Sequence, residues 1–119
     1  MTPADTMKAL EYFRAKHDPT TGPLELYEMI RKNEDINVID VREPFDFALG
    51  HIPGAINLPG RAWGTSFGLT ENKLNVIYSH SAACHLAAGA SEYFAKRGFS
   101  VMELAGGFEQ WQRHSLPVV

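Results

Sequence analysis

The side chains best suited to covalent chemistry lie in one short segment, from Ser79 to His85. Cys84, the only cysteine of the chain, stands in this segment close to two histidines, His80 and His85. A thiolate is the reactive form of cysteine, and protonated imidazoles nearby favour it by adding positive charge. These residue types indicate a nucleophilic or redox-sensitive thiol at Cys84. A half-buried structural thiol is the alternative, because free cysteines are commonly buried.

This segment joins an expected strand to an expected helix. Residues 76–78 are apolar β-formers, and apolar residues recur at helical spacing from Cys84 until Gly98 ends the helix. A loop that runs from the carboxyl end of a strand into a helix gathers unpaired backbone N–H groups around one point. The helix dipole adds partial positive charge there. Such a loop is suited to hold an anion or a thiolate.

Strands and helices are expected to alternate along the rest of the chain. Apolar periodicity and Gly or Pro punctuation predict strands over 36–41, 55–58, 76–78 and 100–104, and helices over 23–32, 43–50, 84–97 and 108–114. A helix beginning near Thr2, a possible strand over 12–16, a loop over 18–22 and a connection over 59–70 complete the expected order. This alternation predicts an α/β fold with a largely parallel sheet covered on both faces.

Length and charge limit the classes of function. A chain of 119 residues predicts one domain, 1–119. The net charge of −3 argues against nucleic acid and anionic membranes as partners. No signal peptide and no membrane helix are expected, and one cysteine cannot form an internal disulfide. We therefore expect a cytoplasmic protein, since single free thiols suit a reducing compartment.

Several ordered motifs resemble the rhodanese homology domain. They are Ile39–Glu43, Phe47–Pro59, Gly98–Val101, Leu104–Trp111 and Leu116–Val118, so that the resemblance is strongest over 36–118. It implies a three-layer α/β fold, with a central, mostly parallel sheet of about five strands and helices on both faces.

The resemblance implies a sulfurtransferase without a cofactor or a metal. A cysteine at the first position of the loop takes a sulfane sulfur from thiosulfate or a persulfide, and passes it to cyanide or a thiol. In this chain that position is Ser79, which cannot carry a persulfide. Low or absent activity is expected as the chain stands, which suggests an inactive or an engineered form. Cys84 matches a second cysteine found in a subgroup of the family and is a possible surrogate thiol.

The resemblance also suggests which residues surround the chemistry. The expected anion-binding loop comprises His80, Ser81, Ala82, Ala83 and His85, and Arg61 and Trp63 in the connection are candidate substrate contacts. Three further residues near the site are expected to be structural: Asp40 and Arg42 through charge-assisted hydrogen bonds, and His51 through a bond to an acid such as Asp40.

Other functions remain possible for such a loop. A non-catalytic anion-binding or protein-interaction module would keep the backbone amides but lack turnover. A phosphatase or arsenate reductase of related fold is less favoured, because those enzymes resemble a longer loop with Cys first and Arg last. The spacing of His80, Cys84 and His85 is not a complete metal site, so no metal is expected.

Overall fold

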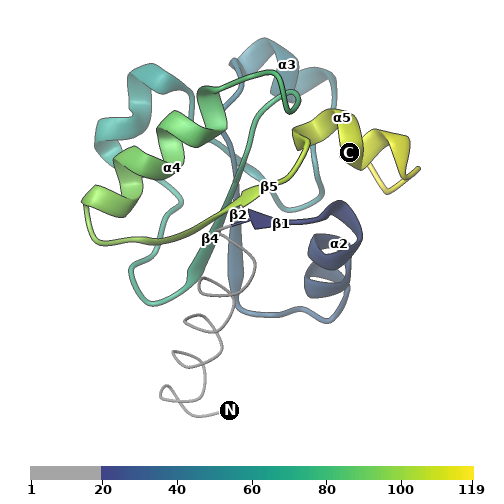
Figure 1. The fold of residues 1–119 in the computed structure, drawn as a ribbon, viewed down its shortest axis with the longest axis horizontal. Coiled ribbons are helices and arrows are strands. Elements are labelled where there is room, and N and C mark those ends of the chain that lie inside the picture. Colours follow the sequence, from purple (N-terminus) through teal and green to yellow (C-terminus); the bar gives the residue numbers. More distant parts are fainter. Residues whose placement is uncertain (1–19) are drawn as a thin grey trace.

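A five-stranded parallel sheet forms the centre of the protein, as the computed structural model shows for residues 20–119 (Figure 1). The strand order is β1-β5-β4-β2-β3, and every neighbouring pair is parallel. The strands are β1 (Thr20–Thr21), β2 (Ile36–Asp40), β3 (Ile56–Asn57), β4 (Leu74–Tyr78) and β5 (Ser100–Leu104). This arrangement confirms the predicted α/β class.

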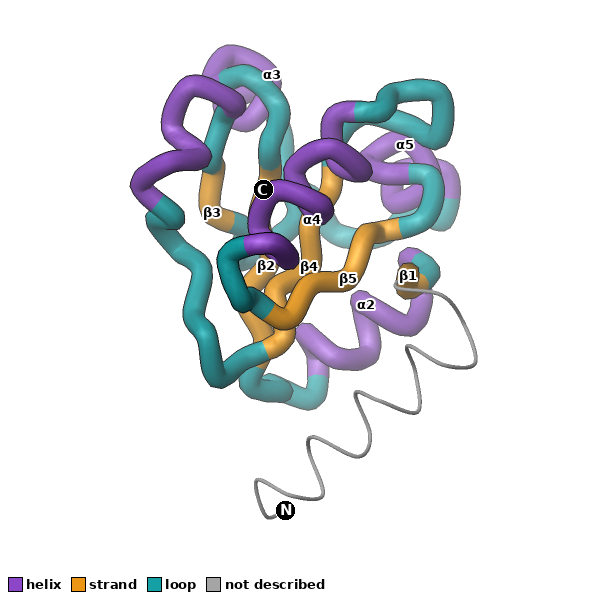
Figure 2. The backbone as a smooth tube through the Cα atoms, turned by 60° about the vertical axis from the view of Figure 1, so that its left-hand side comes forward, coloured by secondary structure: helices purple, strands orange, loops and turns teal. Residues whose placement is uncertain are grey.

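Helices cover both faces of this sheet, as Figures 1 and 2 show. The helical elements are α2 (Pro23–Arg31), α3 (Pro44–Leu49), the 3₁₀-helix η1 (Gly60–Thr65), α4 (Leu86–Lys96) and α5 (Gly107–Arg113). On one face, Leu26 of α2 and Trp111 of α5 pack in one buried cluster with residues of β2, β4 and β5. On the other face, Phe94 of α4 and Trp63 of η1 belong to a second cluster. The result is a three-layer arrangement.

The central strand β4 is covered on both faces, which explains the continuous apolar run of its sequence. Val76, Ile77 and Tyr78 are all fully buried, and their side chains alternate between the two clusters. A parallel strand with helices on both sides has no solvent-facing positions, so it shows no polar alternation. Among the described residues, no helix is long and apolar enough to cross a membrane.

The loops that follow three strands meet at one edge of the sheet. Asp40 at the end of β2 is in register with Tyr78 at the end of β4 and with Asn57 at the end of β3. Because the strands are parallel, the segments after them emerge on the same side. The loop with Ser79 and Cys84 therefore lies beside the segment that carries Arg42.

Three of the predicted boundaries were wrong. Thr20–Thr21 was assigned to a loop, but it forms β1 by pairing with β5. The connection over 59–70 contains η1, and α4 begins at Leu86 rather than at Cys84, with His85 as its N-cap. The helix expected near Thr2 and the strand expected over 12–16 lie outside the described residues. The strand β5 has the predicted bounds, and the other helices and strands differ from their predictions by at most two residues at either end.

Candidate active site

Ser79 and Cys84 face each other across the loop between β4 and α4. The Ser79 hydroxyl oxygen lies 3.3 Å from the Cys84 sulfur, within hydrogen-bond contact. Ser79 is almost completely buried, at 1 % exposure, whereas Cys84 is partly exposed. Small molecules from solvent therefore reach the sulfur more readily than the hydroxyl.

The N-terminal end of α5 holds this loop in place through its backbone. The Phe108 N–H donates to the Ser79 carbonyl at 2.9 Å, and the Glu109 N–H donates to the His80 carbonyl at 2.8 Å. Gly107 has a positive φ of 60°, and a Cβ there would come within 2.7 Å of the Ser79 carbonyl oxygen. Only glycine allows this close approach. The Gly106-Gly107 pair thus permits α5 to anchor the loop between β4 and α4.

The surroundings of Cys84 lower the pKa of its thiol. The hydrogen bond from the Ser79 hydroxyl is the largest cause, followed by a backbone hydrogen bond at Leu86 and a weaker one at His80, while partial burial acts in the opposite direction. The imidazoles of His80 and His85 were expected to favour the thiolate by their positive charge. Neither imidazole is among these causes, which are a hydroxyl and backbone amides.

Replacement of Ser79 by alanine is expected to raise the pKa of Cys84 towards its ordinary value. The variant loses the hydroxyl that stabilises the thiolate, so less thiolate is present at pH 7 and alkylation by iodoacetamide slows several-fold. The rate measured between pH 5 and pH 10 should show its midpoint at higher pH than in the wild type. An unchanged profile would show that the hydroxyl does not stabilise the thiolate.

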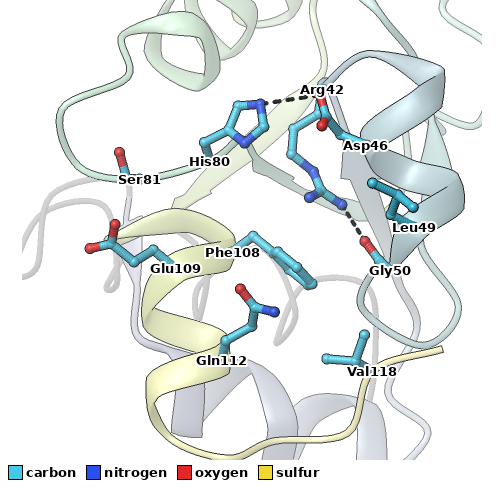
Figure 3. A pocket seen from close by; sticks show the side chains of 10 residues that line it. All are labelled: Arg42, Asp46, Leu49, Gly50, His80, Ser81, Phe108, Glu109, Gln112 and Val118. Carbon is cyan, nitrogen blue, oxygen red and sulfur yellow. Dashed lines mark hydrogen bonds and ion pairs between the residues drawn. The ribbon is translucent and has the colours of Figure 1, made fainter.

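A cleft of about 410 Å³ opens beside this loop at the same edge of the sheet (Figure 3). His80 and Ser81 contribute the loop wall, α3 contributes the opposite wall, and α5 forms the floor. The lining residues are Arg42, Asp46, Leu49, Gly50, His80, Ser81, Phe108, Glu109, Gln112 and Val118. A pocket of this size fits a small substrate.

Sequence reasoning placed Arg42, His80 and Ser81 near the site but missed the residues from α3 and α5. Asp46 of α3 lies 3.6 Å from the His80 ring at its nearest atoms. Gly106-Gly107, which follows the carboxyl end of β5, was a usable signal, since ligand sites in such folds lie at that edge. Ala82, Ala83 and His85 are exposed in the loop and do not line the cleft.

Asp40 and Arg42 form a buried ion pair, and Arg42 also lines the cleft. The guanidinium Nη2 lies 2.7 Å from the carboxylate and also donates to the Gly50 carbonyl at 2.7 Å. Asp40 is fully buried and Arg42 is 4 % exposed, with its guanidinium 4.2 Å from the centre of the Phe108 ring. These contacts tie the segment after β2 to the turn after α3. The guanidinium is thereby held by protein partners.

His51 is bound differently from what the sequence suggested. Its ring nitrogen Nδ1 contacts the Phe47 carbonyl at 2.8 Å, and the ring stacks on that of Phe47 at 3.7 Å. The expected bond to an acid such as Asp40 was wrong, because the Asp40 carboxylate is bound by Arg42. His51 therefore closes the end of α3 through backbone and ring contacts.

The two candidates in the connection do not line the cleft. Arg61 forms an exposed ion pair with Glu43 at 3.0 Å. Trp63 donates its indole N–H to the Leu58 carbonyl at 3.1 Å and packs against the Tyr93 ring. Trp63 thus covers the apolar layer beneath α4. Within residues 20–119, no three His, Cys, Asp or Glu side chains are grouped as metal ligands would be.

The comparisons with known proteins agree with this architecture. A family profile described as the rhodanese-like domain matches residues 22–114. The chain belongs to the rhodanese-like family. The matched residues include the loop between β4 and α4.

Relatives of this rhodanese-like chain include named sulfurtransferases. A sulfurtransferase from Allochromatium vinosum is 33% identical over 96 residues, covering 79% of this chain and 88% of the relative. The thiosulfate sulfurtransferase GlpE of Stutzerimonas stutzeri is 34% identical over 89 residues, covering 72% of this chain and 78% of the relative. The family is of sulfurtransferase type, and its substrates are in general a sulfur donor and a sulfur acceptor.

A solved structure shares the whole fold. The BH2092 protein from Bacillus halodurans superposes with a TM-score of 0.82 at 33% identity, covering 96% of this chain and 85% of that chain. The rhodanese-like fold expected from the motifs is thereby confirmed.

Proposed function

We propose that this protein is a rhodanese-type sulfurtransferase in which Cys84 carries the sulfane sulfur and Ser79 occupies the usual nucleophile position. The observation that carries the proposal is the 3.3 Å contact between the buried Ser79 hydroxyl and the Cys84 sulfur. The hydroxyl stabilises the thiolate as a hydrogen-bond donor, and the thiolate is the form that attacks sulfur. Thiosulfate turnover is low, because the thiol lies at the far end of the loop instead of directly after β4.

The loading step needs no oxidant. The Cys84 thiolate attacks the outer sulfur of thiosulfate, a new S–S bond forms, and the S–S bond of thiosulfate breaks. Sulfite leaves with the electron pair, and the terminal sulfur on Cys84 is left as a persulfide anion. A low-molecular-weight persulfide can donate in the same way, with its thiolate as the leaving group. An acceptor thiol or cyanide then takes the outer sulfur.

Intact mass spectrometry tests the identity of the carrier. After treatment with thiosulfate or glutathione persulfide and removal of the donor, the wild type should gain the mass of one sulfur atom, and Cys84→Ser should gain none. Loss of the only thiol removes the only side chain in the chain that can form a persulfide. Peptide mapping should place the added sulfur on Cys84.

The rival function is a non-catalytic module of the same fold. A wild type that gains no sulfur from either donor, yet binds thiosulfate or another oxyanion in a titration, would replace the proposed transfer with binding. A phosphate monoester assay tests the less favoured phosphatase function in the same preparation.

A further inference from the structure

One imidazole on the wall of the cleft is paired with a carboxylate from a different element. The His80 Nε2 atom lies 3.6 Å from the Asp46 Oδ2 atom, and Figure 3 shows both side chains bordering the same cleft. The His80 side chain is 50% exposed and that of Asp46 is 36% exposed, so a molecule in the cleft can reach them. No described residue forms a hydrogen bond with the other ring nitrogen, Nδ1.

The same residue connects the cleft to the thiol. His80 directly follows Ser79, whose hydroxyl lies 3.3 Å from the Cys84 sulfur, and the His80 side chain lines the cleft. The carbonyl of His80 is held by the Glu109 N–H, so the position of this residue is set from two sides. Cys84 itself does not line the cleft, so His80 is the residue that borders the cleft and directly follows the serine in contact with the sulfur.

The geometry points to His80 as the catalytic base that removes the proton from an acceptor thiol in the cleft, with Asp46 as its positioning residue. This inference rests on the proposed role of Cys84. A thiol attacks a persulfide only as thiolate, and an alkyl thiol is mostly protonated at pH 7. Catalytic contacts are often long before the substrate binds, so 3.6 Å between imidazole and carboxylate is compatible with a closer pair in the complex.

The transfer step balances without any further reactant. The neutral imidazole takes the S–H proton of the acceptor, whose sulfur keeps the electron pair and attacks the outer sulfur of the Cys84 persulfide. The new S–S bond forms as the bond to the Cys84 sulfur breaks, and that electron pair returns to Cys84 as a thiolate. The imidazolium gives its proton to solvent. While the imidazole carries this proton, the Asp46 carboxylate stabilises the imidazolium charge.

The other charged residues near His80 have partners of their own, so Asp46 is the residue that positions the imidazole. Arg42, after β2, shares its guanidinium between Asp40 and the Gly50 carbonyl. Glu109 of α5 lines the cleft but forms an ion pair with Arg113 at 3.8 Å. Leu49, Phe108 and Val118 supply apolar surface for the carbon atoms of the acceptor.

Single-turnover discharge of the loaded protein tests the inference. The Cys84 persulfide is prepared, confirmed by intact mass, and mixed with 2-mercaptoethanol or with an acidic aryl thiol that is already ionised at neutral pH. In His80→Gln, discharge to 2-mercaptoethanol should be about 100-fold slower than in the wild type, whereas discharge to the aryl thiol should stay within about twofold. The aryl thiol needs no base.

The pH dependence separates base catalysis from a structural effect. The rate of His80→Gln with 2-mercaptoethanol should rise about tenfold per pH unit, because only the ionised thiol then reacts, whereas the wild-type rate should depend less steeply on pH. Asp46→Asn should slow the alkyl thiol about tenfold and spare the aryl thiol. Asp35→Asn, the same substitution in an ion pair remote from the cleft, should match the wild type.

The outcomes distinguish the two proposals. Failure of the wild type to load sulfur would overturn the role of Cys84 and this inference with it. Normal loading combined with equal slowing of both thiols in His80→Gln, or with none, would overturn only the inference. An equal effect in Glu109→Gln and Asp46→Asn would also overturn it, because the net charge of the cleft would then explain the rates.

Discussion

Replacing Ser79 with cysteine is expected to raise thiosulfate:cyanide sulfurtransferase turnover on the order of 100-fold, since the rate depends most on the nucleophile. The introduced thiol would stand directly after β4, at the position that the rhodanese resemblance assigns to the sulfur carrier. The Ser79 carbonyl is already held by the Phe108 N–H, so the backbone there need not move. Position 79 is buried, but serine and cysteine differ little in size, so the fold should tolerate the change.

The measurement is the initial rate of thiocyanate formation under reducing conditions. Reduction matters because the new sulfur would lie close to Cys84, whose sulfur is 3.3 Å from the present oxygen. The matched control combines Ser79→Cys with Cys84→Ser, which removes any disulfide between the two positions. If neither protein gains activity over the wild type, position 79 is not the nucleophile position.

Replacing Asp40 with alanine should lower the free energy of unfolding by about 3–5 kcal/mol. Arg42 would keep its charge in a site where it is 4% exposed, with the Gly50 carbonyl as its main remaining polar partner. The Asp40 carboxylate also accepts the Arg42 backbone N–H at 2.9 Å, so a second donor would lose its partner. Burial and the Asp40 charge raise the pKa of Tyr78, which therefore stays protonated beside the pair.

Urea denaturation of two further variants shows whether burial is the cause. Asp35 forms an ion pair with Lys73 at 2.9 Å but is 80% exposed, so Asp35→Ala should change stability by no more than about 1 kcal/mol. Replacing both Asp40 and Arg42 by uncharged residues, as in Asp40→Asn with Arg42→Met, should recover part of the loss. Equal losses for Asp40→Ala and Asp35→Ala would contradict this account.

Local patterns determined the elements that carry the reactive loop. The apolar run of β4 and the helical spacing that ends at Gly98 depend on neighbours in the chain, and both elements are present in the predicted order, although α4 begins two residues later than predicted. The rhodanese motifs then identified the fold, because long ordered motifs are specific. The strand β1 escaped prediction because its two residues, Thr20–Thr21, are extended only through pairing with β5.

Contacts between distant residues decided the chemistry of the site. Sequence order places Cys84 between two histidines, but the side chain that lowers its pKa is the Ser79 hydroxyl, which the fold of the loop turns towards the sulfur. Likewise, Asp46 is far from His80 in the chain and meets it only because parallel strands bring their following segments to one edge. The sequence by itself therefore determined the fold family, the reactive loop and its only thiol. The tertiary structure alone decided which groups surround that thiol, because hydrogen bonds and charges act through space.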